Sequence, residues 1–181
     1  RILAAYMNGS RANPEITKDN YQDFDIVFVV TETTSFLNDP SWLSGFGSIA
    51  MMQQPDLNDM AQGITTDTAS SYGWLMLFKD GNRIDLHIET REKPKEEYGK
   101  DSLTVPLLDK HGILPQIEPA SDRDYWIKAP TADLFAACCN NFWWCLGNVC
   151  KVINRDQLPY AYRMYYDVVH AELENMVNWY I

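Results

Sequence analysis

Runs of hydrophobic residues predict strands in the first part of the chain. The segment 23–30 begins with Asp23 and Asp25 and continues as an unbroken apolar run from Ile26 to Val30, which predicts a strand that enters a buried sheet. The runs 72–79 and 83–90 flank Asp80-Gly81-Asn82, which is typical of a hairpin turn. A short apolar segment, 2–7, leads into a polar turn. These segments predict a sheet.

The stretches between the predicted strands differ in character. Residues 12–22 are polar and loop-like, and 35–52 have partly helical apolar spacing. The segment 55–71 is rich in Asp, Thr, Ser and Gly, so we predict a long exposed loop there. We expect 92–98 to be a charged solvent-side segment, and 107–126 to be an irregular crossing loop because it contains prolines and turn residues.

The pattern becomes helical after Pro130. Apolar residues then recur every three or four positions in two stripes, which are Leu134, Cys138, Phe142, Cys145 and Val149, and then Tyr165, Val169, Leu173, Met176 and Tyr180. The second helix is predicted from about Tyr160 to the end. The fold class is therefore α+β, with a mixed-sheet domain at 1–127 and an all-α domain at 128–181.

The amino-acid composition limits the classes of molecule that the protein is expected to bind. The formal net charge is −10, which disfavours nucleic acid and favours cationic ligands. No apolar run is long enough to cross a membrane, and the first residues lack the order of a signal peptide. All four cysteines fall in one predicted helix, where they fit a buried apolar role in a reducing compartment. We expect a cytoplasmic protein with no membrane or nucleic-acid partner.

Three aspartates are the candidate catalytic residues. Asp23 and Asp25 are spaced i and i+2, so on a strand they point to one side. In the strand 83–90, Asp85 lies on the polar face and alternates with apolar positions. Carboxylates are the ligands that Mg²⁺ prefers, and two metal ions about 4 Å apart can stabilise an in-line phosphoryl displacement. Upstream, the Gly9-Ser10 turn offers amides and a hydroxyl to phosphates.

These residues form a pattern that resembles the aminoglycoside 6-adenylyltransferases, or streptomycin adenylyltransferases, within the DNA polymerase β-like nucleotidyltransferases. The resemblance rests on strings spread over nearly the whole chain, which are Met7-Asn8-Gly9-Ser10-Arg11, Gln22-Asp23-Phe24-Asp25-Ile26-Val27, Asp80-Gly81-Asn82-Arg83-Ile84-Asp85-Leu86, Asp124-Tyr125-Trp126, Cys138-Cys139-Asn140, Phe142-Trp143-Trp144 and Leu158-Pro159-Tyr160-Ala161. It implies a nucleotidyltransferase domain followed by a helical domain that is incomplete here.

The resemblance also implies a reaction and a set of roles. AMP would pass from ATP to a hydroxyl of an aminoglycoside, most simply streptomycin, with two magnesium ions as cofactors and antibiotic resistance as the result. Ser10 would hold the triphosphate; Gly9 in the same turn and Arg11, through its guanidinium fork, are further candidates for phosphate binding on chemical grounds. Asp23 and Asp25 would bind metal, and Asp85 would be a metal ligand, the base, or both.

Several alternatives stay open at this point. The same chemistry on another hydroxyl-bearing small molecule, or a catalytically silent nucleotide-binding module, fits the same residues. Arg83 is either a phosphate contact or a surface ion-pair partner. His87 is either a proton shuttle or a cross-strand hydrogen-bonding residue, and Glu89 is a candidate for steering a cationic substrate. Tryptophans 126, 143 and 144 are expected to pack in the core rather than to line a ligand site.

Overall fold

The computed structural model describes residues 1–181, including every side chain except those of Lys95 and Glu96. The chain divides into two compact units, Arg1–Asp124 and Tyr125–Ile181. The first contains the sheet and the second only helices, so the α+β class predicted from the pattern is confirmed. The division falls three residues before the position predicted from the sequence.

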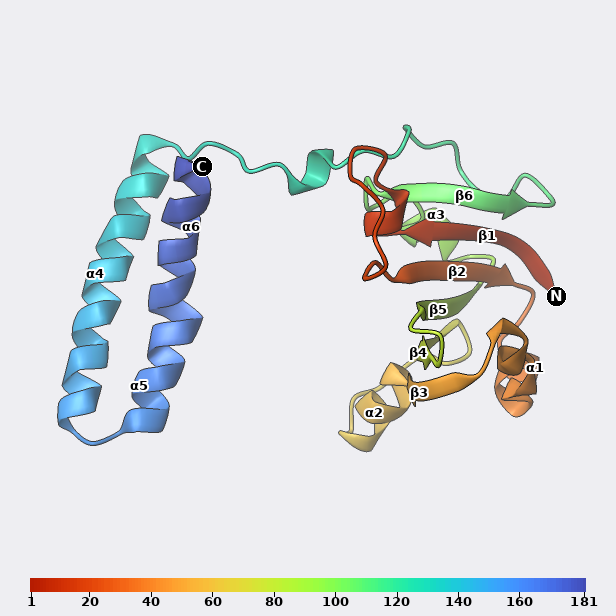
Figure 1. The fold of residues 1–181 in the computed structure, drawn as a ribbon, viewed down its shortest axis with the longest axis horizontal. Coiled ribbons are helices and arrows are strands. Elements are labelled where there is room, and N and C mark those ends of the chain that lie inside the picture. The colour runs from red at the N-terminus through yellow and green to blue at the C-terminus, as the bar shows by residue number, and fades with distance from the viewer. The chain divides into compact units, whose positions relative to one another are not determined.

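A mixed six-stranded sheet organises the first unit, with the strand order β3-β4-β5-β2-β1-β6 (Figure 1). The only parallel pair among the strands described is β2 with β5. The strands are β1 (Ile2–Asn8), β2 (Phe24–Val30), β3 (Ile49–Gln53), β4 (Ser71–Phe78), β5 (Arg83–Thr90) and β6 (Thr104–Asp109). The short helices are α1 (Thr34–Asn38), α2 (Pro55–Ala61) and α3 (Pro94–Glu97), with 3-10 turns at Ser10–Ala12, Pro40–Phe46 and Arg123–Tyr125.

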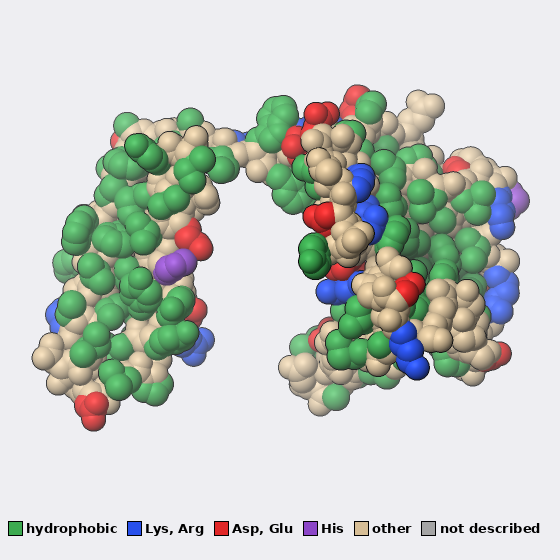
Figure 2. All heavy atoms as spheres, in the orientation of Figure 1, with side chains coloured by type: hydrophobic (Ala, Val, Ile, Leu, Met, Phe, Trp, Pro, Cys, Tyr) green, Lys and Arg blue, Asp and Glu red, His purple; other side chains and the backbone are tan. Residues whose placement is uncertain are grey.

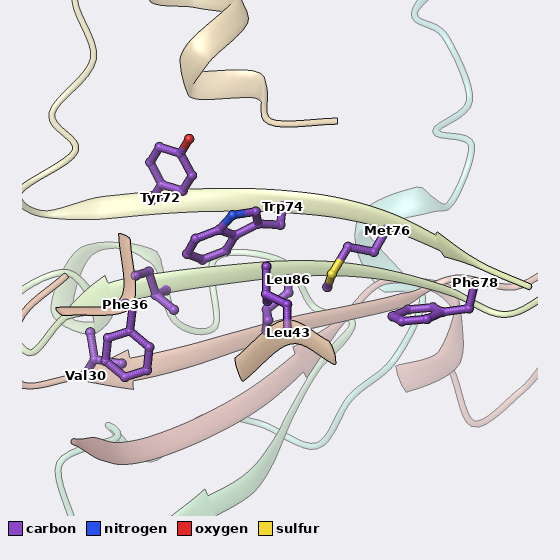
Figure 3. Packing of buried hydrophobic residues seen from close by; sticks show 9 residues of the cluster. Val30, Phe36, Leu43, Tyr72, Trp74, Met76, Phe78 and Leu86 are labelled. Carbon is purple, nitrogen blue, oxygen red and sulfur yellow. The ribbon is translucent and has the colours of Figure 1, made fainter. Parts of the chain in front are cut away.

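One face of the sheet carries the main core. Side chains alternate along a strand, so every second residue of β4 points to this face. Trp74 and Met76 project from β4 toward Leu86 of β5 and Leu43 of the second 3-10 turn (Figure 3). Trp74 is 1% exposed and Met76 is fully buried. This packing fixes which face of β2 and β5 is left for chemistry.

The opposite face has a smaller core near β1 and β2. Tyr6 and Val29 are buried there against Tyr98, which follows α3. The Tyr6 and Tyr98 rings meet edge to face with centroids 5.0 Å apart. Asp25 and Asp85 share this face with the small core but lie nearer the ends of their strands. The apolar packing therefore stops short of the carboxylates.

The local predictions between the strands were confirmed in part. The segment 35–52 is partly helical as predicted, in α1 and the second 3-10 turn, but ends in strand β3, and the predicted loop 55–71 begins with helix α2. The predicted irregular segment 107–126 overlaps β6, an edge strand that contains Pro106. Proline cannot donate to a ladder but is tolerated at an edge, so the sequence hides this strand. By contrast, the predicted strand at 23–30 and the hairpin of β4 and β5 are confirmed.

The second unit is a helical hairpin. Helix α4 (Ala132–Asn154) packs against α5 (Leu158–Met164), a π-helical segment (Tyr165–His170) and α6 (Ala171–Tyr180). Thr131 caps α4 by accepting a hydrogen bond from the Leu134 amide at 3.1 Å. The four cysteines lie in α4 and are free thiols. No helix in the part of the chain that the structure describes is long and apolar enough to span a membrane.

Many hydrophobic side chains of the helical hairpin remain on its surface (Figure 2). Trp143 and Trp144 are 69% and 72% exposed, and Trp126 in the preceding segment is 65% exposed, so the predicted core packing of these residues was wrong. Leu134 and Tyr180, two members of the predicted apolar stripes, are exposed as well. The helical pattern was predicted correctly, but the buried face was only partly predicted.

Candidate functional site

Asp25 and Asp85 form the centre of the site. The two residues are register partners on the parallel strands β2 and β5. Because equivalent residues of paired parallel strands point to the same face, both carboxylates project from one side of the sheet. Asp23 lies just before β2 rather than on it. The structure therefore brings Asp25 and Asp85 together through the sheet, and places Asp23 at the strand entrance.

Arg83 links two of the three carboxylates. Its guanidinium donates from Nε to Asp85 Oδ1 at 2.8 Å and from Nη2 to Asp85 Oδ2 at 2.7 Å. The remaining Nη1 lies 3.3 Å from Asp23 Oδ2. This bidentate pairing corresponds to the ion-pair alternative for Arg83. The guanidinium also neutralises part of the negative charge of the carboxylates at the starts of β2 and β5.

Asp25 has the most strongly perturbed environment of the three aspartates. Burial raises the pKa of its carboxyl above the ordinary value, and the charges of Asp85 and Asp23 raise it further. Arg83 and His87 act in the opposite direction. A carboxylate crowded by others gains proton affinity, and a bound cation relieves that crowding. The site is therefore suited to a cation.

Gly9 lets the turn after β1 approach Asp25 closely. Its φ of +75° favours glycine, and a Cβ at this position would collide with Asp25 Oδ2. The Ala12 amide donates to the Gly9 carbonyl at 2.9 Å, and the Asn13 amide to the Ser10 carbonyl at 3.2 Å, which closes the turn. The Gly9-Ser10 turn thus lies directly beside a carboxylate, as the sequence led us to expect.

Lys18 and Arg11 hold this turn from outside. Lys18 Nζ donates to the carbonyls of Arg11 and Asn13 at 2.6 and 2.7 Å. Arg11 donates from Nε to the Gln22 carbonyl at 3.1 Å, and its guanidinium stacks on the Phe24 ring, 3.8 Å from the centroid. Lys18 has no sequence signal that would have identified it, because its role depends on how the loop folds.

A cavity of about 340 Å³ opens over the paired carboxylates. It is lined by Asn8, Gly9, Asp25, Ile26, Val27, Asp85, His87 and Asp101. His87 is exposed at this face, and its ring lies so close to Gly73 of β4 that a Cβ there would come within 2.6 Å of it. Sequence reasoning did not identify Asn8, Gly73 or Asp101, although Asn8 directly precedes the turn that it did identify.

The donor set suits magnesium in part. In the portion of the chain described, no group of three or more His, Cys, Asp or Glu side chains is spaced to hold a metal. Magnesium, however, is commonly bound through one or two carboxylates together with substrate phosphates. Asp25 and Asp85 supply such a pair next to a turn with free space above it. The residues therefore fit a metal that arrives with a nucleotide.

Glu89 is not placed to steer a substrate, contrary to one expectation. It is only 6% exposed and accepts a hydrogen bond from the Tyr6 hydroxyl at 2.9 Å. Burial, followed by the charge of Glu97, raises its pKa to about 7, while the Tyr6 hydrogen bond and Lys93 act to lower it. Glu89 belongs to the interior behind the site.

A mixed sheet that presents paired carboxylates beside a Gly-Ser turn has the arrangement of a nucleotidyltransferase domain. The profile of the family described as "Streptomycin adenylyltransferase" matches residues 1–181, and the chain belongs to this family.

Named relatives agree with this assignment. The chain is 36% identical to the aminoglycoside 6-adenylyltransferase of Bacillus subtilis (strain 168) and 33% identical to that of Staphylococcus aureus, in each case over all of this chain and 63% of the relative. The chain thus spans less than two thirds of the length of these relatives. A crystal structure of an aminoglycoside 6-adenyltransferase from Bacillus subtilis aligns with a TM-score of 0.49 at 29% identity, covering 99% of this chain and 60% of that one.

Proposed function

We propose that this protein transfers AMP from ATP to a hydroxyl of an aminoglycoside, with streptomycin as the substrate and magnesium as the cofactor, and so confers antibiotic resistance. The observation that carries the proposal is the register pairing of Asp25 with Asp85 beside the Gly9 turn. The named relatives are aminoglycoside 6-adenylyltransferases, which supports the choice of acceptor class. The net charge of −10 favours a cationic acceptor.

The reaction joins an acceptor oxygen to the α-phosphorus of ATP. As that bond forms, the bond from the α-phosphorus to the bridging oxygen breaks and pyrophosphate leaves. The acceptor hydroxyl loses its proton to a carboxylate within hydrogen-bond reach, a role that we assign to Asp85. The bound metal ions, held by Asp25 and Asp85 with Asp23 at the entrance, would supply positive charge to the phosphate oxygens.

The other residues of the site act on the nucleotide. The Gly9 and Ser10 amides and the Ser10 hydroxyl face phosphate oxygens as hydrogen-bond donors. Arg83, which pairs here with Asp85 and Asp23, would be free to contact a phosphate if a metal ion took its place at Asp85. Arg11 keeps the turn in place through Gln22 and Phe24, which leaves its other nitrogens for the triphosphate.

A mass-spectrometric transfer assay tests this function. The protein is incubated with ATP, Mg²⁺ and a panel of aminoglycosides, and the masses of the products are measured. We expect streptomycin to gain the mass of one adenylyl group, which is AMP less one water, with release of pyrophosphate, and we expect chelation of the metal to stop the reaction. Transfer to a different acceptor would show that the substrate is not streptomycin, and consumption of ATP without any adduct would contradict the proposal.

A further inference from the structure

The order of the strands bears on the side from which an acceptor approaches the carboxylates. Within the sheet order, β5 and β2 carry the two carboxylates, β1 leads to the Gly9-Ser10 turn on one side, and β4 lies on the other side. In a nucleotidyl transfer the attacking and leaving oxygens lie roughly in line through the phosphorus. If the turn holds the leaving pyrophosphate, the acceptor comes from the side of β4.

His87 is the polar side chain at that position. It lies on the same face of β5 as Asp85, two residues further along, which is about 7 Å at the rise of a strand. It lines the same cavity as Asp25 and Asp85, and it is exposed. It is therefore close enough to contact an acceptor whose hydroxyl is being attached to phosphorus above the carboxylates.

Gly73 sets the position of this ring. Three ring atoms of His87 lie 2.6, 2.9 and 3.2 Å from where a Cβ of residue 73 would be. Gly73 is the register partner of His87, and its amide donates to Asp56 Oδ2 at 2.9 Å, which ties β4 to the first turn of α2. The absence of a side chain at residue 73 therefore lets the imidazole lie low on the sheet.

We propose that His87, seated on Gly73, forms the acceptor-binding side of the site and hydrogen-bonds a polar group of the aminoglycoside. This inference rests on the proposed function and names the residue that determines acceptor affinity. A ring nitrogen can donate to, or accept from, the hydroxyl and amino groups that such a molecule carries. His87 acts on binding of the acceptor, whereas the Gly9-Ser10 turn acts on ATP.

Steady-state kinetics on the full chain separate these roles. We expect His87→Ala to raise the KM for the aminoglycoside about tenfold, as expected for one lost hydrogen bond, while the KM for ATP stays within a factor of two. His87→Gln keeps hydrogen-bonding groups and should recover part of the affinity. His111→Ala, which removes the exposed histidine of a distant loop, is the control and should change neither constant.

A double-mutant cycle with Gly73→Ala tests the position of the ring itself. The added methyl displaces the imidazole, so we expect Gly73→Ala to raise the acceptor KM to a similar extent. In the double variant the methyl meets no ring. The acceptor KM should therefore rise as much as in His87→Ala alone, and not by the product of the increases in the two single variants. Unchanged acceptor KM in His87→Ala, with transfer by the parent intact, overturns this inference alone. No transfer by the parent overturns the proposed function instead.

Discussion

At the scale of single residues, the site depends on how closely a turn approaches a carboxylate. Gly9 combines a positive φ with the absence of a side chain against Asp25. Asp-x-Asp was correctly predicted at the start of a buried strand, because an apolar run after polar residues is a local signal. The ion pair between Arg83 and Asp23 could not be predicted, because it requires β2 and β5 to be neighbours, whereas the pair between Arg83 and Asp85 lies within β5.

Substitution of Gly9 tests this approach. Gly9→Ala should strain the backbone and push Asp25 out of place, so we expect turnover to fall by at least tenfold. Gly63→Ala is a matched control, since Gly63 has φ +80° and nothing within 4 Å of the added methyl. Both substitutions place alanine at a positive φ, and thermal unfolding measures the backbone strain that results in each variant. Equal turnover in the two variants would show that contact with Asp25 is unimportant.

Ser10 gives a second test at this scale. Removing the hydroxyl with Ser10→Ala takes one donor from the triphosphate, and a hydrogen bond to a charged group is worth about 1.5–3 kcal/mol. We expect a rise in the KM for ATP, a fall in turnover, or both, while the acceptor KM and the far-ultraviolet circular dichroism stay the same. ATP kinetics identical to those of the parent would remove Ser10 from the site.

Among the helices and strands, those with a local hydrophobic periodicity were predicted from the sequence. Those whose position depends on tertiary contacts were missed. Helix α2 has only seven residues and gains its place from Asp56, which bonds the Gly73 amide, and from Gln54, which accepts from the Tyr72 hydroxyl. Short helices are marginal alone, so composition indicated a loop. In the second unit a π-helical segment adds residues to a turn, and the half-buried face of α6 then carries Ala171, Met176 and Trp179 while Leu173 and Tyr180 are exposed.

Glu89 of β5, which accepts a hydrogen bond from Tyr6 of β1, makes a pH-dependent contribution to stability. Because its folded-state pKa is raised to about 7, the folded state binds the proton more tightly than the unfolded chain. Stability from this group is present below the pKa of the unfolded chain and is lost as pH rises through about 7. Glu89→Gln keeps the acceptor for Tyr6 without the charge, and should therefore be more stable than the parent at pH 8 by about 2 kcal/mol.

Urea unfolding at pH 4, below the ordinary pKa of a glutamate, and at pH 8 measures this difference. The parent and Glu89→Gln should be nearly equal at the lower pH and diverge at the higher one. Glu92→Gln, an exposed residue three positions away, should follow the parent at both. A Glu89→Gln variant less stable than the parent at pH 8 would mean that the buried carboxylate is charged and compensated.

At the scale of the whole molecule, charge is the property most directly tied to the proposed substrate. The net charge of −10 produces a field that attracts a polycation and repels ATP. The screening length falls from about 10 Å at 0.1 M salt to about 3 Å at 1 M. We therefore expect the KM for streptomycin to rise several-fold with added salt while the KM for ATP falls or holds. Parallel changes in both constants would exclude steering by charge.

We propose that Asp25 and Asp85 form one catalytic centre on adjacent parallel strands. The most direct test is the rate of AMP transfer to streptomycin by Asp85→Asn, compared with Asp25→Asn and with the control Glu92→Gln. We predict that both aspartate variants keep the circular dichroism of the parent and lose at least a hundredfold in turnover, while the control retains full activity. Near-parental turnover in Asp85→Asn would contradict the account, because an aspartate that only faces solvent tolerates asparagine at almost no cost.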